Sequence, residues 1–406
     1  MDSTLATMIK NATMTTKHSR AVNVFVIMLC QGFQTVSAAA IALFLPAIRQ
    51  ELGLSFTQAG TLSAAGILVY ALMQIPAGYL ADRYGLKRLF FIGALGTTLL
   101  CVTFGFVTVF WQAVVNQMVA GAFHAFLFQS GLALLASWFG AERRATAMGL
   151  SLVAIFSGQL VVNAFGPVLV AYFNWRSPFM LFGSAGIWAA FLYLWLGREL
   201  AYSGARQKLR IGDALELFRH PFMWLCGVIQ YIRLGVMQGI LFWLPSFLLD
   251  EQGLPLQVTG FIIAIRTLLI APSTILGGYI SDRLRNPTAV MALSLIILAL
   301  TTAGFTKVSN LSVLMALIFV NAIFVQSYFG PLFSIPVDRY GTKMLGTLSG
   351  FGNFYANLGG LTFTYVLGLL KDRTGYFEAG FNAIATACVL GLVFTFLLDR
   401  MRRASG

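Results

Sequence analysis

The stretch Pro221–Asn286 decides the fold class, because it holds two long apolar runs separated by a short turn. Residues 221–249 read PFMWLCGVIQYIRLGVMQGILFWLPSFLL, and residues 256–280 read LQVTGFIIAIRTLLIAPSTILGGYI. A helix needs ~20 mostly apolar residues to cross the hydrocarbon core of a bilayer, and both runs exceed that length. The stretch therefore predicts a hairpin of two membrane-spanning helices.

Each helix of this hairpin carries one arginine near its middle, Arg233 in the first and Arg266 in the second. A guanidinium near the bilayer centre costs at least ~2.5–3.5 kcal/mol on insertion scales, and it stays charged. Helix counting places the two arginines at a similar depth, and the sequence has no Asp or Glu deep in any apolar run. We therefore expect both to bind an anionic solute, the alternative being hydrogen bonds to backbone carbonyls or internal water.

Composition excludes a water-soluble protein. The chain has 406 residues, of which 58% are hydrophobic and only 10% charged, whereas a soluble domain has about a quarter charged residues. The net charge of +13 is then explained by basic cytoplasmic loops rather than by nucleic acid binding.

The four cysteines stand singly in apolar runs, at Cys30, Cys101, Cys226 and Cys388. We therefore expect no disulfide, no metal site and no cofactor.

The same length criterion predicts twelve spanning helices, which the polar stretch 198–220 divides into two groups of six. The expected helices cover residues 22–46, 56–80, 89–109, 111–138, 145–171, 177–197, 221–249, 256–280, 288–306, 310–335, 345–370 and 378–398. The expected domains are a tail (1–21), a six-helix bundle (22–197), a linker (198–220), a second bundle (221–398) and a tail (399–406). This is an all-α membrane protein.

Basic residues predict the orientation. With the N-terminus inside, the cytoplasmic segments collect twenty Lys and Arg residues, and the opposite side collects five. This asymmetry follows the positive-inside rule, so both termini should be cytoplasmic. The first apolar run, Val22–Pro46, is too long for the core of a secretory signal and is expected to be a membrane helix. The short loops favour a bacterial cytoplasmic (inner) membrane.

The two halves align on each other at an offset close to 200 residues. Phe44-Leu45-Pro46 matches Trp243-Leu244-Pro245, Gly78-Tyr79 matches Gly278-Tyr279, and Asp82-Arg83 matches Asp282-Arg283; Gly53-Leu54 and Gly60 also recur as Gly253-Leu254 and Gly260. Several matches at nearly constant offset indicate a parallel internal repeat. Transporters built from two parallel repeats bind their substrate between the halves, near the membrane midplane.

Residues 78–88, GYLADRYGLKR, lie between the second and third predicted helices. Their pattern and position resemble the signature loop of the major facilitator superfamily. Glycine permits the tight turn, and a carboxylate can pair with the basic neighbours and helix end, which makes the loop a conformational latch. The expected latch residues are Gly78, Asp82, Arg83, Gly85, Lys87 and Arg88, with the second-half counterparts Gly278, Asp282 and Arg283.

Two further features test this resemblance. The fifth predicted helix contains Gly158 and Gly166-Pro167, similar to the family's glycine-proline motif for close helix packing. In the fourth, Gln117 replaces the arginine that the family usually has four residues before Gly121, so that arginine's role in proton transfer is not carried over. The resemblance implies an alternating-access secondary transporter that works as a monomer, and it is nearest to the anion:cation symporter and oxalate/formate-like branches.

Other polar residues accompany the two arginines in the predicted spans. His124 titrates near neutral pH and is the candidate for proton coupling, the alternative being a structural hydrogen bond. The remaining candidates share helix faces on the family's path-lining helices, although hydrogen bonding between helices would also explain them. The full set of candidate substrate-binding residues is Arg233, Arg266, His124, Gln31, Gln34, Gln159, Asn163, Asn321, Tyr328, Asn353 and Asn357.

The sequence therefore predicts a secondary transporter of a small organic anion, most simply a carboxylate, coupled to protons or to exchange of a second anion. Bidentate contacts suit arginine to carboxylates, and a phosphorylated metabolite is compatible as well. The alternatives are an efflux pump of the same fold, which would normally need a buried carboxylate for cationic drugs, and a membrane receptor without transport activity. No nucleotide-binding loop or catalytic constellation points to an enzyme.

Overall fold

The computed structural model describes residues 20–139, 144–198, 219–341 and 345–403, and these are almost entirely helical. Most of the expected tail 1–21 and most of the linker 198–220 lie outside the described residues. The first half contains a helix at residues 20–33, then α2 (Val36–Leu52), α3 (Phe56–Tyr84), α4 (Leu86–Phe104), α5 (Phe110–Trp138), α6 (Arg144–Tyr172) and α7 (Arg176–Leu196). The second half contains α9 (Pro221–Ser246), η2 (Phe247–Glu251), α10 (Leu256–Leu284), α11 (Pro287–Gly304), α12 (Leu311–Val325), α13 (Phe329–Tyr340), α14 (Leu345–Thr374) and α15 (Glu378–Arg403).

Eleven helical segments in the described part of the chain are long and apolar enough to cross a membrane. The 30-residue helix α14 is a further long helix, and it occupies the position of the eleventh expected span. The prediction of an all-α protein with twelve long helices is therefore confirmed. Two expected single spans are interrupted: residues 22–46 break at Gln34–Thr35, and residues 310–335 break at Gln326–Tyr328.

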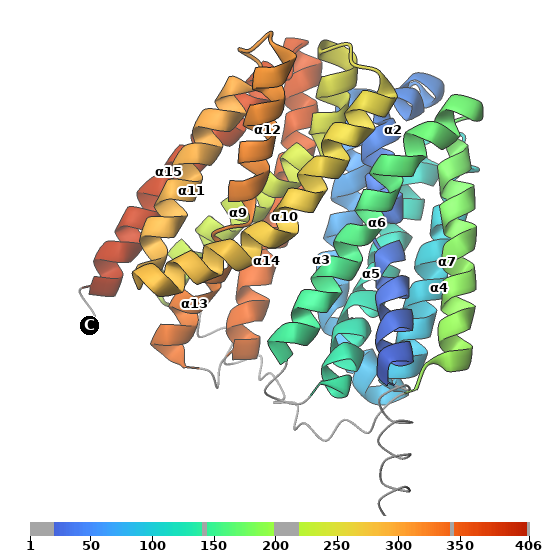
Figure 1. Ribbon diagram of the computed structural model, residues 1–406, viewed down its shortest axis with the longest axis horizontal. Coiled ribbons are helices and arrows are strands. Elements are labelled where there is room, and N and C mark those ends of the chain that lie inside the picture. Colours follow the sequence, from blue (N-terminus) through green and yellow to red (C-terminus); the bar gives the residue numbers. More distant parts are fainter. Residues whose placement is uncertain (1–19, 140–143, 199–218, 342–344, 404–406) are drawn as a thin grey trace, which may run out of the picture.

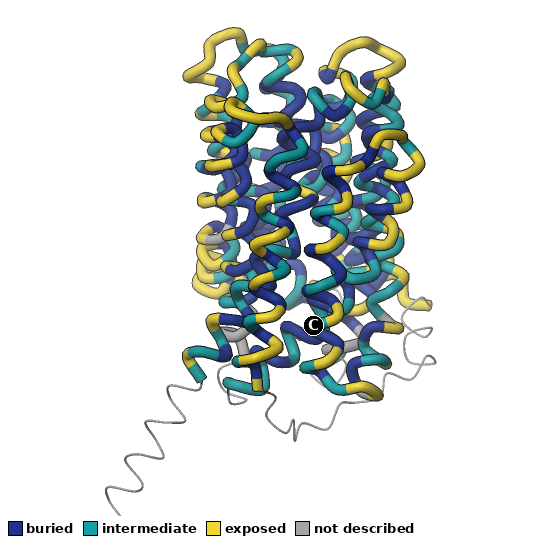
Figure 2. The backbone as a smooth tube through the Cα atoms, turned by 90° about the vertical axis from the view of Figure 1, so that its right-hand side faces the viewer, coloured by how far each residue is buried: buried dark blue, intermediate teal, exposed yellow. Residues whose placement is uncertain are grey.

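The helices form two bundles that lie side by side (Figure 1). In the first bundle α5 packs on α3 and α4, and α4 packs on α7; in the second, α14 packs on α9 and α11 packs on α15. Three helix pairs join the bundles: α2 with α9, α3 with α14, and α6 with α10. Buried residues fill the interior, and exposed residues cover the outside of the helices and the turns (Figure 2).

The bundles contact each other closely at one end of the molecule, which we call the closed end; it carries the turns at residues 53–55 and 252–255. There the Asp372 carboxylate of α14 accepts hydrogen bonds from the backbone N–H groups of Phe56 and Thr57, at 2.9 and 2.6 Å. The Arg49 guanidinium stacks on the Phe56 ring, 3.2 Å from its centroid, and lies 3.9 Å from Asp250. The two hydrogen bonds to Asp372 and the approach of Arg49 to Asp250 join the halves across the interface.

The opposite end, the open end, has space beside the interface helices. A Cβ atom built on Gly78 of α3, Gly278 of α10 or Gly350 of α14 would meet no other atom within 4 Å. Both ends of the described chain lie at this end of the molecule (Figure 1). The contacts between the halves named above lie at the closed end, and we therefore describe this conformation as open at the opposite end.

Candidate functional site

Arg266 is the most unusual polar residue of the interior. It lies on α10 with an exposed fraction of 0%, and its Nε, Nη1 and Nη2 atoms are buried without a hydrogen-bond partner among the described groups. A buried charge without a counter-ion or hydrogen bonds is strongly unfavourable, and guanidinium cannot lose its proton in a protein. The side chain thus presents three sets of unused donors, which an anion would satisfy.

Arg233, in contrast, has protein partners. Its Nε donates to Oε1 of Gln230 at 2.8 Å, its Nη1 donates to Oε1 of Gln326 at 2.8 Å, and its guanidinium lies over the Phe329 ring, 4.8 Å from the centroid. Both acceptors are neutral amides, so the positive charge is solvated but not neutralised. The two predicted anion-binding arginines therefore stand in different environments.

On the side of the first bundle, the break at Gln34–Thr35 packs against α6. The Thr35 hydroxyl donates to the carbonyl of Ile155 at 2.7 Å, and a Cβ on Gly158 would overlap the carbonyl oxygen of Gly32. Glycine at 158 thus permits the close packing that the glycine-proline motif predicted. Gln159, the next residue, is buried, and its Oε1 has no hydrogen-bond partner in the described part of the chain.

Gln34 and His124 meet at this break. Gln34 Nε2 donates a long hydrogen bond, 3.5 Å, to the backbone carbonyl of His124. The Gln34 Oε1 and His124 Nε2 atoms are buried and have no hydrogen-bond partner among the residues that the structure describes. These unpaired polar atoms of the first bundle resemble the unpaired donors of Arg266, since each is ready for a ligand that the protein itself does not supply.

The contact between α6 and α10 shows which residues of the two bundles lie at the same level along the helix axes. A Cβ on Gly260 would collide with the Asn163 carbonyl oxygen and the Pro167 ring, so these helices touch there. The helices run antiparallel. With a rise of 1.5 Å per residue, Gln159 and Arg266 lie about 6 and 9 Å from this contact, both toward the open end. They therefore occupy a similar level in the middle of the molecule.

Several predicted site residues have partners within one bundle. Gln31 accepts from the Ser151 hydroxyl at 3.0 Å, between two helices of the first bundle. Asn321 donates to the hydroxyls of Thr301 and Thr302 on α11, at 3.0 and 3.2 Å. These contacts favour the alternative of helix-to-helix hydrogen bonding for both residues, although Gln31 Nε2 and Asn321 Oδ1 have no partner among the described groups.

The remaining candidates of the second bundle differ among themselves. Asn357 donates to the backbone carbonyl of Asn353, one turn earlier on α14, at 2.8 Å. Tyr328 is fully buried at the start of α13, and its hydroxyl has no partner among the described groups. Tyr328 is therefore available to a ligand, whereas one amide hydrogen of Asn357 is already used.

Two polar residues beside Arg233, Gln230 and Gln326, were not among the predicted site residues. The spacing of Gln230 and Arg233 places both side chains on one helix face, and this signal was available in the sequence. The apolar run of residues 311–335 contains one stretch of three consecutive polar residues, Gln326, Ser327 and Tyr328. This stretch marks the helix break. The link between Arg233 and Gln326 joins residues 93 positions apart and needed the fold.

The two predicted latch segments adopt the same local structure. Arg83 donates to the Tyr79 hydroxyl at 3.4 Å, and in the second half Arg283 donates to the Tyr279 hydroxyl at the same distance. Gly85, between α3 and α4, has a φ of +88°, a conformation that favours glycine. The Asp82 side chain lies outside the described residues, so the latch with Lys87, Arg88 and Asp282 stays a prediction.

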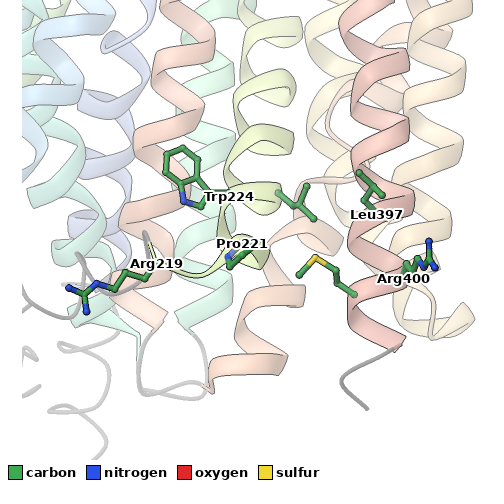
Figure 3. A pocket seen from close by; sticks show the side chains of 7 residues that line it. Arg219, Pro221, Trp224, Leu397 and Arg400 are labelled. Atoms are coloured by element: carbon green, nitrogen blue, oxygen red, sulfur yellow. The ribbon is translucent and has the colours of Figure 1, made fainter.

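A surface groove at the open end lies apart from these residues. It has a volume of about 490 Å³ and lies between α9 and α15. Pro221, Trp224 and Leu397 line it, and Arg219 and Arg400 stand on opposite sides of it (Figure 3). Arg219 precedes Arg233 by 14 residues, which corresponds to about 20 Å along a helix. The groove is therefore not part of the candidate site.

A two-bundle helical membrane protein with buried, unpaired polar groups at the level where the bundles meet has the architecture of a membrane transporter. A family model supports this conclusion, since the model described as "Major Facilitator Superfamily" matches residues 27–364. The chain belongs to this family, whose members are transporters and not enzymes.

Individual relatives cover most of the chain. It is 26% identical over 83% of its length to the probable sulfoacetate transporter SauU of Cupriavidus necator, covering 84% of that protein. It is 25% identical over 88% of its length to the D-galactonate transporter of Escherichia coli O6:H1, covering 90%, and 22% identical over 84% to the hexuronate transporter of Bacillus subtilis, covering 86%.

The fold also matches solved structures. A bacterial homologue of the human lysosomal transporter Spinster, in an inward-facing and unoccupied conformation, superposes with a TM-score of 0.79 at 19% identity, over 94% of this chain and 97% of the other. The occupied form gives a TM-score of 0.80 at 17% identity with the same coverage. These similarities confirm the fold.

Proposed function

We propose that the chain is a secondary transporter of small organic anions in which Arg266 binds the anionic group of the substrate. The observation that carries the proposal is the fully buried guanidinium of Arg266, whose three nitrogen atoms have no partner among the described groups. A carboxylate or sulfonate would supply both the missing negative charge and the missing acceptors. The substrate thereby offsets an electrostatic cost that the empty protein bears.

The substrates of the relatives agree with this chemistry. Sulfoacetate, galactonate and hexuronates each contain a carboxylate, and the sugar acids add several hydroxyl groups. The buried side-chain oxygens of Gln34 and Gln159 accept from no donor within the described ranges, and a substrate hydroxyl would provide one. The second bundle then holds the charge of a hydroxylated acid, and the first bundle contacts its neutral part.

The open end corresponds to the cytoplasmic side in this proposal. The latch segments and both ends of the described chain lie there, and the positive-inside rule predicts a cytoplasmic location for both. The protein then spans the cytoplasmic membrane of a bacterium and moves substrate by alternating access as a monomer. His124 carries a coupling proton in a symport mechanism, and exchange of a second anion is the other mode of coupling.

A thermal-shift screen of the purified chain tests the site. A ligand that binds only the folded state adds about 2.7 kcal/mol of stability at 100 times its Kd, so galactonate, glucuronate and sulfoacetate should raise the Tm. The Arg266→Gln variant should lose this shift, and Arg373→Gln, which changes an exposed arginine at the closed end, should keep it. Equal shifts in wild type and Arg266→Gln would refute the proposed anion site.

A further inference from the structure

The break in the tenth span, Gln326–Tyr328, is held by three neighbouring helices. Arg233 of α9 donates to Gln326, the hydroxyls of Ser294 on α11 and Ser327 hydrogen-bond at 2.8 Å, and a Cβ on Gly277 of α10 would overlap the Ser327 carbonyl oxygen. All three side chains of the break are buried, with exposed fractions of 9%, 7% and 0%. A buried interruption with backbone groups freed from the helix is a natural pivot for the segment that follows it.

Arg233 contacts both the first residue of this pivot and the helix that follows it. Its Nη1 donates to Gln326, the residue after α12, and its guanidinium stacks on Phe329, the first residue of α13. Gln230, one turn away on α9, holds the Nε atom and so orients the guanidinium plane. The side chain therefore fastens the start of α13 to α9, and α13 continues from there toward the open end.

The strength of this link is limited, because its acceptors are amides. Hydrogen bonds from guanidinium to carboxylate are roughly twice as strong as bonds between neutral groups and are often bidentate, whereas Gln326 offers one neutral oxygen. A link of moderate strength is what a reversible pivot needs, since a bond that forms in one conformation must break in the other. Residue 326 is a glutamine, whose side chain has the size and shape of glutamate but is neutral.

We infer that Gln326 and Arg233 are positioning residues for transport: their hydrogen bond holds α13 in the position that keeps the open end open, and it breaks when α13 pivots about residues 326–328 to close that end. Gln326 acts through Arg233 and α13 and does not contact the substrate. The inference rests on the proposed alternating-access function, and it adds a specific residue that governs the rate of conformational exchange.

The test uses distances between spin labels on the full chain in nanodiscs, without added anion. The labels are placed at Tyr84→Cys, at the end of α3, and Asp338→Cys, on α13; both positions are exposed at the open end. The four native cysteines are buried, so labelling is directed to the new sites. Gln326→Glu turns the link into an ion pair and should raise the fraction of long distances at least about fivefold; Gln326→Leu removes the acceptor and should lower it.

A matched control is Ser294→Ala, which removes an equally buried hydrogen bond to the same break without touching Arg233. It should leave the distance distribution unchanged. If Ser294→Ala reproduces the effect of Gln326→Leu, or if Gln326→Glu has no effect, the inference is wrong. If Gln326→Leu does not fold, the inference is tested by comparing the distance distributions of wild type, Gln326→Glu and Ser294→Ala.

Transport and binding separate this inference from the proposed function. In liposomes, Gln326→Glu should lower the maximal rate of galactonate uptake at least about tenfold, while the Tm shift produced by galactonate stays as in wild type. If galactonate does not raise the Tm of the wild-type protein, the proposed function is refuted. The distances between the labels then remain as the test of the pivot. Loss of the shift only in Gln326→Glu would show that Gln326 contacts substrate, and the inference would fail.

Discussion

Asp372, on α14 of the second bundle, accepts a hydrogen bond of 2.6 Å from the backbone N–H of Thr57, at the start of α3 in the first bundle. The same carboxylate accepts from the N–H of Phe56, so it binds two of the free donors at the beginning of a helix. A carboxylate also interacts favourably with the positive end of the helix dipole. One half of the transporter thus caps a helix of the other half, and it can do so only when the closed end is shut.

The first prediction concerns this contact between the halves. Asp372→Asn keeps the size of the side chain but removes its charge and one acceptor, at a cost of about 1 kcal/mol, the usual value for a helix cap. Labels at the exposed positions Gln50 and Gln257 should then show about a fivefold larger population of separated closed ends. Glu378→Gln, which changes an exposed carboxylate nearby, should have no such effect, and equal distributions for both variants would contradict the prediction.

A second prediction separates binding from stability at Arg266. Arg266→Met should lower galactonate uptake at least about 100-fold, because several charge-assisted hydrogen bonds to the substrate are lost. The same variant should have a free energy of unfolding about 1–3 kcal/mol larger than that of the empty wild type, because an unpaired buried charge is removed. It should therefore unfold at a higher temperature. Circular-dichroism melting and liposome uptake measure the two effects. A variant that is both inactive and less stable would show that Arg266 has a structural role.

Two adjacent glycines of α10 provide a third prediction. Gly277→Ala places a methyl group on the Ser327 carbonyl, and relief of that overlap should cost about 1–3 kcal/mol. Gly278→Ala has open space around the new methyl group, so its stability should remain within about 0.5 kcal/mol of wild type. Unfolding midpoints of the two variants in the same detergent check this. Similar midpoints would mean that α10 does not approach the break as closely as described.

The fourth prediction distinguishes the two modes of coupling. If His124 carries the coupling proton, His124→Gln should abolish the stimulation of galactonate uptake by an inward proton gradient. Exchange of internal for external galactonate needs no net proton movement and should continue at a rate within about twofold of wild type, since the backbone carbonyl that Gln34 contacts is unchanged. Stimulation by the gradient in the variant would exclude His124 and favour anion exchange as the mode of coupling.

By itself, the sequence determined the class of the protein and the two arginines from which the anion-binding residue of the candidate site is proposed. The long apolar runs require spanning helices in any bilayer, since every backbone polar group must be satisfied within the helix. The repeated pattern of Gly78–Arg83 and Gly278–Arg283 indicated two related halves. Arg233 and Arg266 stood out because a charge in the middle of an apolar run without a nearby acid is costly wherever the helix packs.

Only the tertiary structure decided what each polar side chain contacts. Arg233 and Arg266 look alike in sequence, but one is bonded to Gln230 and Gln326 and the other has no partner among the described groups. Asn321, expected at the site, contacts α11, and Asp372, which no pattern singled out, joins the two halves. Periodicity specifies the face of a helix on which a residue lies, whereas its partners depend on the packing of helices that are distant in the chain.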